Sequence, residues 1–147
     1  AKPRRFSVDV PRIRAQSPRC TMRILVADPS RTMRNIARAV LAQLGYYDVD
    51  EAADANEAVS RASFANFDLC IFDRAIKDQD GSSLLRALRR AGNRAGFIEL
   101  RTADFPSGPA DESELPLSQS LCKPFAPEAL RRCIDAAITA QSAAQAA

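Results

Sequence analysis

The sequence contains no histidine and no tryptophan. Without histidine, catalytic sites that pair a serine or cysteine nucleophile with a histidine base are excluded. The four cysteines, Cys20, Cys70, Cys122 and Cys133, form no C-x-x-C pair, so a zinc site is not expected either. Three of them, Cys70, Cys122 and Cys133, stand among apolar residues, which favours reduced thiols that pack in a core.

Long apolar runs are also absent. No stretch of about 18 apolar residues occurs, so we expect no membrane span. The first residues are rich in Arg and Pro and lack the apolar stretch of a signal peptide. These absences predict a cytoplasmic protein. The length of 147 residues, 46% of them hydrophobic, fits one domain with a core of its own.

The net charge of +3 is unevenly distributed. Residues 1–23 carry seven basic side chains and a single acid, Asp9, whereas the remainder carries fourteen basic and seventeen acidic side chains. Residues 1–21 also contain three prolines and few large apolar groups, too little to bury a core. We therefore predict a flexible basic tail over residues 1–21, in front of a globular body at 22–141.

Strand and helix patterns alternate along that body. Residues 69–72 are apolar at every position, which is typical of a parallel strand buried on both faces. The alternation predicts a doubly wound α/β fold with a five-stranded parallel sheet and a C-terminal tail at 142–147. Strands are expected at 23–27, 47–52, 69–72, 97–100 and 121–122, and helices at 33–44, 56–64, 84–88 and from Pro127 onward.

Polar side chains stand where four of these strands end. They are Asp28, Asp73, Thr102 and Lys123. In parallel sheets, binding and catalytic groups collect at the carboxyl ends of the strands. Taken singly, Asp28 would serve equally well as a cap of the following helix, and Lys123 as a solvated charge.

Several short motifs along the chain resemble those of the receiver domain of bacterial response regulators, of the CheY-like kind, over about residues 22–140. One such motif alone is weak evidence for the family, but five that follow one another in the family's order are specific. They are Asp28, Asp73, Asp80-Gly81, Thr102-Ala103 and Lys123-Pro124-Phe125, with Ser30 to Arg34 as a further match at the start of the first helix.

The resemblance implies a phosphate-accepting pocket. Asp73 would take a phosphoryl group from a histidine kinase or a phosphotransfer protein. Mg²⁺ would be held by Asp28, Asp73 and the backbone carbonyl of Ala75, because hard cations prefer oxygen ligands. Lys123 would pair with the phosphoryl oxygens, and Thr102 would hydrogen-bond one of them.

The match to the family is incomplete. Receivers usually carry two acids in tandem after the first strand, and the first of these positions is taken here by Ala27. Fewer carboxylates predict weaker Mg²⁺ binding. Lys77 replaces a common proline, and Ser120 replaces a frequent aromatic residue. The Lys123–Pro124 bond is cis in the family. Three prolines and a glycine at 104–116 oppose the long helix that receivers have there.

Two functions therefore remain open from the sequence. The first is a single-domain response regulator that is switched at Asp73. The second is a phosphorylation-independent CheY-like adaptor. With no further domain expected after residue 141, we expect docking onto a protein, such as a kinase, a phosphotransfer protein or a flagellar-motor component, and no sequence-specific DNA binding.

The basic tail suggests a ligand for the second function. Guanidinium groups pair with phosphates and with the edge of guanine, and they stack on flat rings. Some CheY-like proteins bind cyclic di-GMP through arginine-rich segments, and this chain resembles them in that respect. A solvated tail, non-specific attraction of nucleic acid, or a segment appended before Met22 are the alternatives. The candidate residues are Arg4, Arg5, Asp9, Arg12 and Arg14.

Overall fold

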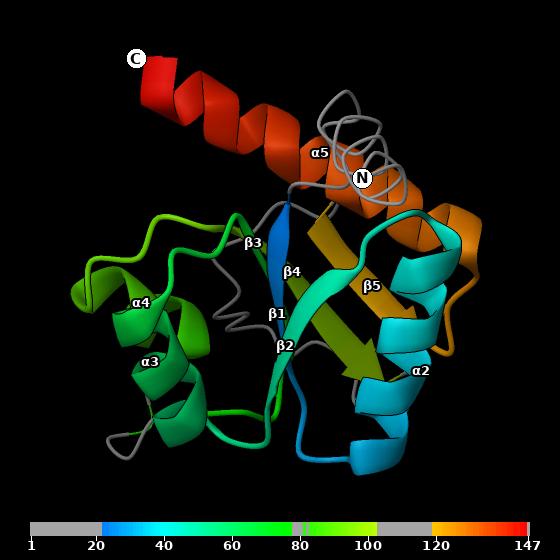
Figure 1. The fold of residues 1–147 in the computed structure, drawn as a ribbon, viewed down its shortest axis with the longest axis horizontal. Helices are drawn as coiled ribbons and strands as arrows, with labels where there is room; N and C mark the ends of the chain where they lie inside the picture. The colour runs from blue at the N-terminus through cyan, green and yellow to red at the C-terminus, as the bar shows by residue number, and fades with distance from the viewer. Residues whose placement is uncertain (1–21, 78–80, 82, 103–118, 147) are drawn as a thin grey trace, which may run out of the picture.

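A sheet of five parallel strands forms the centre of the molecule (Figure 1). The computed structural model describes residues 22–77, 81, 83–102 and 119–146. The strands run in the order β2-β1-β3-β4-β5. They are β1 (Arg23–Ala27), β2 (Asp48–Ala52), β3 (Leu69–Asp73), β4 (Gly96–Thr102) and β5 (Ser120–Lys123).

Helices cover both faces of the sheet, which confirms the predicted doubly wound α/β fold. Figure 1 shows α2 and α5 on one face and α3 and α4 on the other. This arrangement places every strand-to-helix connection at the same edge of the sheet, where the carboxyl ends of the strands lie. The helices are α2 (Arg31–Gln43), α3 (Ala55–Phe64), α4 (Leu84–Arg90) and α5 (Pro127–Ala146).

Alternation along β1 divides its side chains between two cores. Ile24 and Val26 belong to a cluster with residues of α2 and α5, and Leu25 and Ala27 belong to a cluster with residues of α3 and α4. Successive side chains of a strand point to opposite faces, so a central strand contributes to both layers. The all-apolar run of β3 is buried throughout, as predicted for a strand covered on both faces.

Three helices begin at polar caps. The Ser30 hydroxyl accepts a hydrogen bond from the backbone N–H of Met33 at 3.2 Å and caps α2. Asp54 caps α3, and Ser83 caps α4. Such caps satisfy backbone N–H groups that have no partner inside a helix. Because Ser30 performs this role, the carboxylate of Asp28 is not needed as a helix cap.

The structure corrects two details of the sequence interpretation. Helix α5 continues to Ala146, through residues expected to form a C-terminal tail, because alanine and glutamine are good helix formers. Cys122 is exposed rather than packed in the core, because β5 is an edge strand. Cys70 and Cys133 are buried, as expected.

The peptide bond between Lys123 and Pro124 is cis, as the family resemblance implied. The arginine-rich segment 1–21, Asp80, and the proline-rich segment 104–116 lie outside the described residues. Across the ranges that the structure describes, no helix is long and apolar enough to cross a membrane.

The buried thiol of Cys70 predicts a loss of stability at alkaline pH. Burial raises the pKa of Cys70 above its ordinary value of 9.0. The folded chain therefore keeps this proton to a higher pH than the unfolded chain does. The resulting stabilisation is complete below pH 9 and falls above it by up to about 1.4 kcal/mol per pH unit for one proton. Burial also raises the pKa of Cys133, which acts in the same direction.

Urea unfolding from pH 8 to pH 11 tests this expectation. Cys70→Ala should be less stable than the wild type at pH 8, by about 1 kcal/mol for the lost packing, but its stability should fall less steeply above pH 9. Cys122→Ala, which removes an exposed thiol, is the matched control and should follow the wild-type slope. Equal slopes for all three proteins would contradict the role of Cys70.

Candidate functional site

The order of the strands brings two acidic residues together. β1 and β3 are neighbours in the sheet, and the chain turns from β1 into α2 on one face and from β3 toward α4 on the other. At such a switch point, the connections diverge and leave a crevice at the carboxyl ends of the strands. Asp28 directly follows β1, and Asp73 ends β3. Both therefore lie at the edge of this crevice.

Lys123 connects the two acids. Its ammonium group lies 2.7 Å from Oδ2 of Asp28 and also donates a hydrogen bond to Oδ2 of Asp73. The three side chains are only 10%, 3% and 13% exposed for Lys123, Asp28 and Asp73, so water screens these charges poorly. A solvated Lys123 is thus ruled out, and the structure brings Asp28, Asp73 and Lys123 together at one place.

The environment keeps Lys123 charged. Burial by itself would lower the pKa of Lys123, but the hydrogen bonds and the charges of Asp28 and Asp73 outweigh burial and raise it. Lys123 therefore stays protonated at neutral pH and places a positive charge between the two acids.

The turn after β1 holds Asp28 in place. Its second carboxylate oxygen, Oδ1, accepts the backbone N–H of Ser30 at 2.8 Å. Its own N–H donates to the carbonyl of Ala52 in β2 at 3.0 Å. Among the residues whose burial is described, Asp28 is one of two buried acids, together with Glu99, and has 2% of its surface exposed. A buried carboxylate that is held by donors on both oxygens is positioned for a task other than solvation.

A similar turn orients Asp73. Oδ1 of its carboxylate accepts the N–H of Ala75 at 2.7 Å, and its backbone carbonyl accepts the N–H of Ile76 at 3.0 Å. Ala75 is itself exposed and lines the same pocket. Because both oxygens of Asp73 have donors, its carboxylate is held in one orientation toward the pocket.

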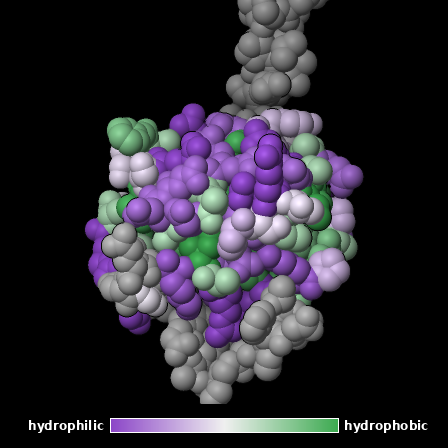
Figure 2. All heavy atoms as spheres, turned by 90° about the horizontal axis from the view of Figure 1, so that it is seen from below, coloured by the Kyte–Doolittle hydropathy of each residue, from purple (hydrophilic) through white to green (hydrophobic). Residues whose placement is uncertain are grey.

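The three charged groups lie in an open pocket of about 560 Å³. Arg74, Lys77 and Arg101 add positive charge to its lining, with Pro29 and Leu100 as apolar neighbours. Figure 2 views the molecule from the end where the strands finish, and hydrophilic side chains cover most of the described surface there. Acidic oxygens beside basic groups suit a metal ion together with an anion that shares it.

The structure places Pro29, and not Ala27, beside Asp28 in the pocket lining. Ala27 is fully buried and packs in the apolar cluster with Phe72 and residues of α3 and α4, away from the pocket. Pro29, in contrast, lines the pocket next to Asp28. The interpretation that Ala27 stands for a lost pocket acid was therefore wrong. The residue that lies beside Asp28 in the pocket lining is Pro29, which carries no carboxylate.

The remaining oxygen ligands still fit a magnesium ion. Among the described residues, no group of three or more His, Cys, Asp or Glu side chains is placed to hold a metal. Mg²⁺ nevertheless binds proteins through one or two carboxylates and keeps several of its waters. Asp28, Asp73 and the backbone carbonyl of the exposed residue Ala75 could supply ligands of this kind.

Two further residues, Thr102 and Arg34, are paired with residues of the site. The backbone of Thr102 ends β4, a strand end as expected from the sequence, and the structure pairs it in register with Lys123 of β5. Arg34, which belongs to the matching motif Ser30 to Arg34, donates a hydrogen bond to the backbone carbonyl of Asp28 at 2.7 Å. The motif does not predict this contact, since the contact depends on the turn of the chain after β1.

The pocket lies within a segment of known type. The family model described as "response regulator receiver domain" matches residues 24–135. The solved structure of the chemotaxis response regulator CheY4 of Vibrio cholerae superposes with a TM-score of 0.64 at 27% identity, and covers 80% of this chain and 99% of that chain. A CheY-like receiver domain from Methanospirillum hungatei has a TM-score of 0.62 at 21% identity, which shows the shared fold alone.

Two curated relatives match in part. The chemotaxis protein CheY of Pseudomonas aeruginosa is 37% identical over 68 residues, which are 46% of this chain and 55% of that protein. The sensor protein EvgS of Escherichia coli (strain K12) is 42% identical over 66 residues, which are 45% of this chain and 5% of that protein. The chain thus spans about half of one relative and a small part of the other.

Restoring a carboxylate at position 29 should strengthen Mg²⁺ binding. One added charge about 6 Å from a divalent ion contributes about 1.4 kcal/mol even at the dielectric constant of water, or about tenfold in affinity. We expect Pro29→Asp to bind Mg²⁺ about tenfold more tightly than the wild type, as measured by titration calorimetry.

Ala27→Asp is the matched comparison. It places the same charge in the apolar cluster, where burial of an unpaired carboxylate costs several kcal/mol, so we expect a lower melting temperature and no gain in Mg²⁺ affinity. The reverse result, with tighter binding by Ala27→Asp and none by Pro29→Asp, would return the missing acid to position 27.

Proposed function

The chain belongs to the response regulator receiver family, and we propose on this basis that Asp73 accepts a phosphoryl group from a phosphorylated histidine of a kinase or phosphotransfer protein. The observation that carries the proposal is the shared ammonium group of Lys123 between Asp28 and Asp73. A phosphoacceptor needs little covalent help from the protein, because positioning and charge neutralisation supply most of the catalysis.

The transfer follows from the placement of these groups. An oxygen of Asp73 attacks the phosphorus, the bond from phosphorus to the imidazole nitrogen of the donor breaks, and its electron pair stays on that nitrogen. Lys123 exchanges its hydrogen bond with Asp73 for one with a phosphoryl oxygen. The hydroxyl of Thr102 would donate a hydrogen bond to another of these oxygens. Asp28, Asp73 and the carbonyl of Ala75 would hold Mg²⁺, which would supply neutralisation of the charge between the acid and the phosphate.

Phosphorylation then changes the connections at the end of the sheet. The modification adds negative charge and oxygens that accept hydrogen bonds, and it removes the direct contact between Lys123 and Asp73. Because Lys123 ends β5 and Thr102 ends β4, the ends of two neighbouring strands would sense the new group. We propose that phosphorylation changes which conformation of these strand ends is populated, and that a protein partner in the cytoplasm recognises this change when it docks. A flagellar-motor component is one example of such a partner.

Mass spectrometry of the intact protein tests the phosphoacceptor. With acetyl phosphate as a small phosphodonor and Mg²⁺, the wild type should gain the mass of one phosphoryl group, and Asp73→Asn should gain none. Asp135→Asn, which changes an exposed acid on α5, is the control and should be modified like the wild type. An unmodified wild type, or equal modification of Asp73→Asn, would refute the proposal.

A second candidate function rests on two features together. The pocket lacks the second tandem acid because Pro29 stands there, and seven basic side chains accompany a single acid in residues 1–23. An adaptor that receives its signal as cyclic di-GMP through Arg4, Arg5, Asp9, Arg12 and Arg14 would need no phosphate on Asp73. Guanidinium groups supply both phosphate pairing and guanine recognition for such a ligand.

Calorimetric titration with cyclic di-GMP at two salt concentrations separates this candidate from general attraction of anions. If the candidate holds, the full chain binds at both concentrations, and the double change Arg4→Ala with Arg5→Ala abolishes binding, whereas Lys2→Ala retains it. Binding that disappears at high salt, or that falls equally in all variants, would indicate counterion release instead of a specific site.

A further inference from the structure

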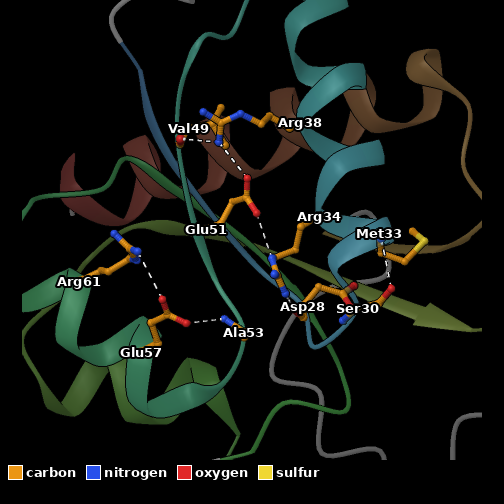
Figure 3. Close-up of polar contacts among 10 residues, drawn as sticks. All are labelled: Asp28, Ser30, Met33, Arg34, Arg38, Val49, Glu51, Ala53, Glu57 and Arg61. Carbon is orange, nitrogen blue, oxygen red and sulfur yellow. Dashed lines mark hydrogen bonds and ion pairs between the residues drawn. The ribbon is translucent and has the colours of Figure 1, made fainter.

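Arg34 of α2 lies between the pocket and the β2 edge of the sheet. Figure 3 shows its side chain reaching from α2 toward the turn after β1. Its Nη1 donates a hydrogen bond to the backbone carbonyl of Asp28 at 2.7 Å, and its Nε donates to Oε1 of Glu51 at 2.9 Å. A single guanidinium group thus joins the loop that carries a pocket acid to a neighbouring strand.

The arginine is held firmly in this position. Its side chain is only 15% exposed, in contrast to the 48% of Arg38 one turn along the same helix. The second carboxylate oxygen of Glu51 accepts a hydrogen bond from Nη1 of Arg38 at 3.1 Å (Figure 3). Glu51 is therefore fixed from both sides, and a planar guanidinium that bonds through two nitrogens has little freedom to rotate.

The carbonyl that Arg34 binds belongs to Asp28, a buried residue whose backbone groups need hydrogen-bond partners. The N–H of Asp28 is paired with Ala52, which leaves the carbonyl on the other side of the same residue to be satisfied by Arg34. A buried carbonyl without a donor costs about 1–3 kcal/mol, so the loop would rearrange if the arginine were lost. Because the carboxylate is attached to the same residue, it would move with the backbone.

Charge compensation fits the same role. An arginine beside a cation site would normally repel a metal ion. Here the carboxylate of Glu51, which also pairs with Arg38, lies 2.9 Å from Arg34 and offsets part of its charge. The chain thereby obtains a rigid donor for the Asp28 backbone whose positive charge is partly offset by a neighbouring acid.

We propose that Arg34 is a positioning residue of the pocket, which holds the backbone of Asp28 and thereby sets the place of the carboxylate that would ligate Mg²⁺. The proposal rests on the proposed function for the identity of the ion. The contact that defines it, from Arg34 to the Asp28 carbonyl, exists without the ion. Groups that orient a metal ligand typically contribute 10- to 100-fold to metal affinity, and we expect the lower end for an effect through the backbone.

Arg34→Gln and Arg38→Gln form a matched pair for the test. Each variant loses one ion pair with Glu51 and one hydrogen bond to a backbone carbonyl, that of Asp28 for Arg34 and that of Val49 for Arg38. Calorimetric titration with Mg²⁺ should show affinity about tenfold weaker for Arg34→Gln and unchanged for Arg38→Gln. Arg34→Lys, which reaches one partner but not both, should lie between the wild type and Arg34→Gln.

A second measurement needs no metal. The N–H of Ser30 is bonded to Oδ1 of Asp28, so its NMR shift and its hydrogen exchange report where the carboxylate lies. In the absence of Mg²⁺, the NMR shift of this amide should change more, and its hydrogen exchange should be faster, in Arg34→Gln than in Arg38→Gln. The two melting temperatures are compared first, so that a difference in overall stability is not mistaken for a local effect.

The outcomes are distinguishable. An unchanged Ser30 amide in Arg34→Gln, or equal changes in both variants, would overturn the positioning role whether or not the wild type binds Mg²⁺. A wild type that binds no Mg²⁺, with the Ser30 amide altered only in Arg34→Gln, would count against the proposed function while supporting the role of Arg34.

Discussion

The ammonium group of Lys123, shared between two buried carboxylates, is the interaction on which the site depends. Two acids that converge in a poorly screened pocket repel each other unless a cation lies between them. Lys123 supplies that cation from β5, which is separated from β1 by two strands of the sheet. The parallel sheet makes the contact possible, because it brings the ends of sequence-distant strands to one edge.

The neighbourhood of the pocket shows how ordinary fold elements free these groups for chemistry. Ser30 caps α2, so Asp28 keeps its carboxylate for the pocket, and the Ser30 N–H binds that carboxylate as well. Arg34 then satisfies the carbonyl of Asp28 and is itself paired with Glu51 of β2. Together these contacts fix the position of one acid with respect to the rest of the sheet.

Pro29 limits the number of acids in the pocket. Asp28 and Asp73 are the acids in its lining, and Pro29 beside Asp28 adds none. Mg²⁺ binding depends on the number of charged ligands, so this chain is expected to need more Mg²⁺ or to rely less on it. The basic lining by Arg74, Lys77 and Arg101 favours an anionic ligand at the same time.

The sequence by itself determined the alternation of strands and helices and the all-apolar β3, and it supplied the roles expected of Asp28, Asp73 and Lys123. These features depend on hydrophobic periodicity and on positions at strand ends, and residues close together in the sequence specify both. Tertiary structure alone decided that Pro29 rather than Ala27 faces the pocket, since the pleat directs residue 27 into the core. It also decided that Cys122 lies on an exposed edge strand, and that Arg34 is the arginine of α2 that reaches Asp28. These last outcomes depend on which strand lies at the edge and on how the chain turns after β1, and no neighbouring residue in the sequence specifies either.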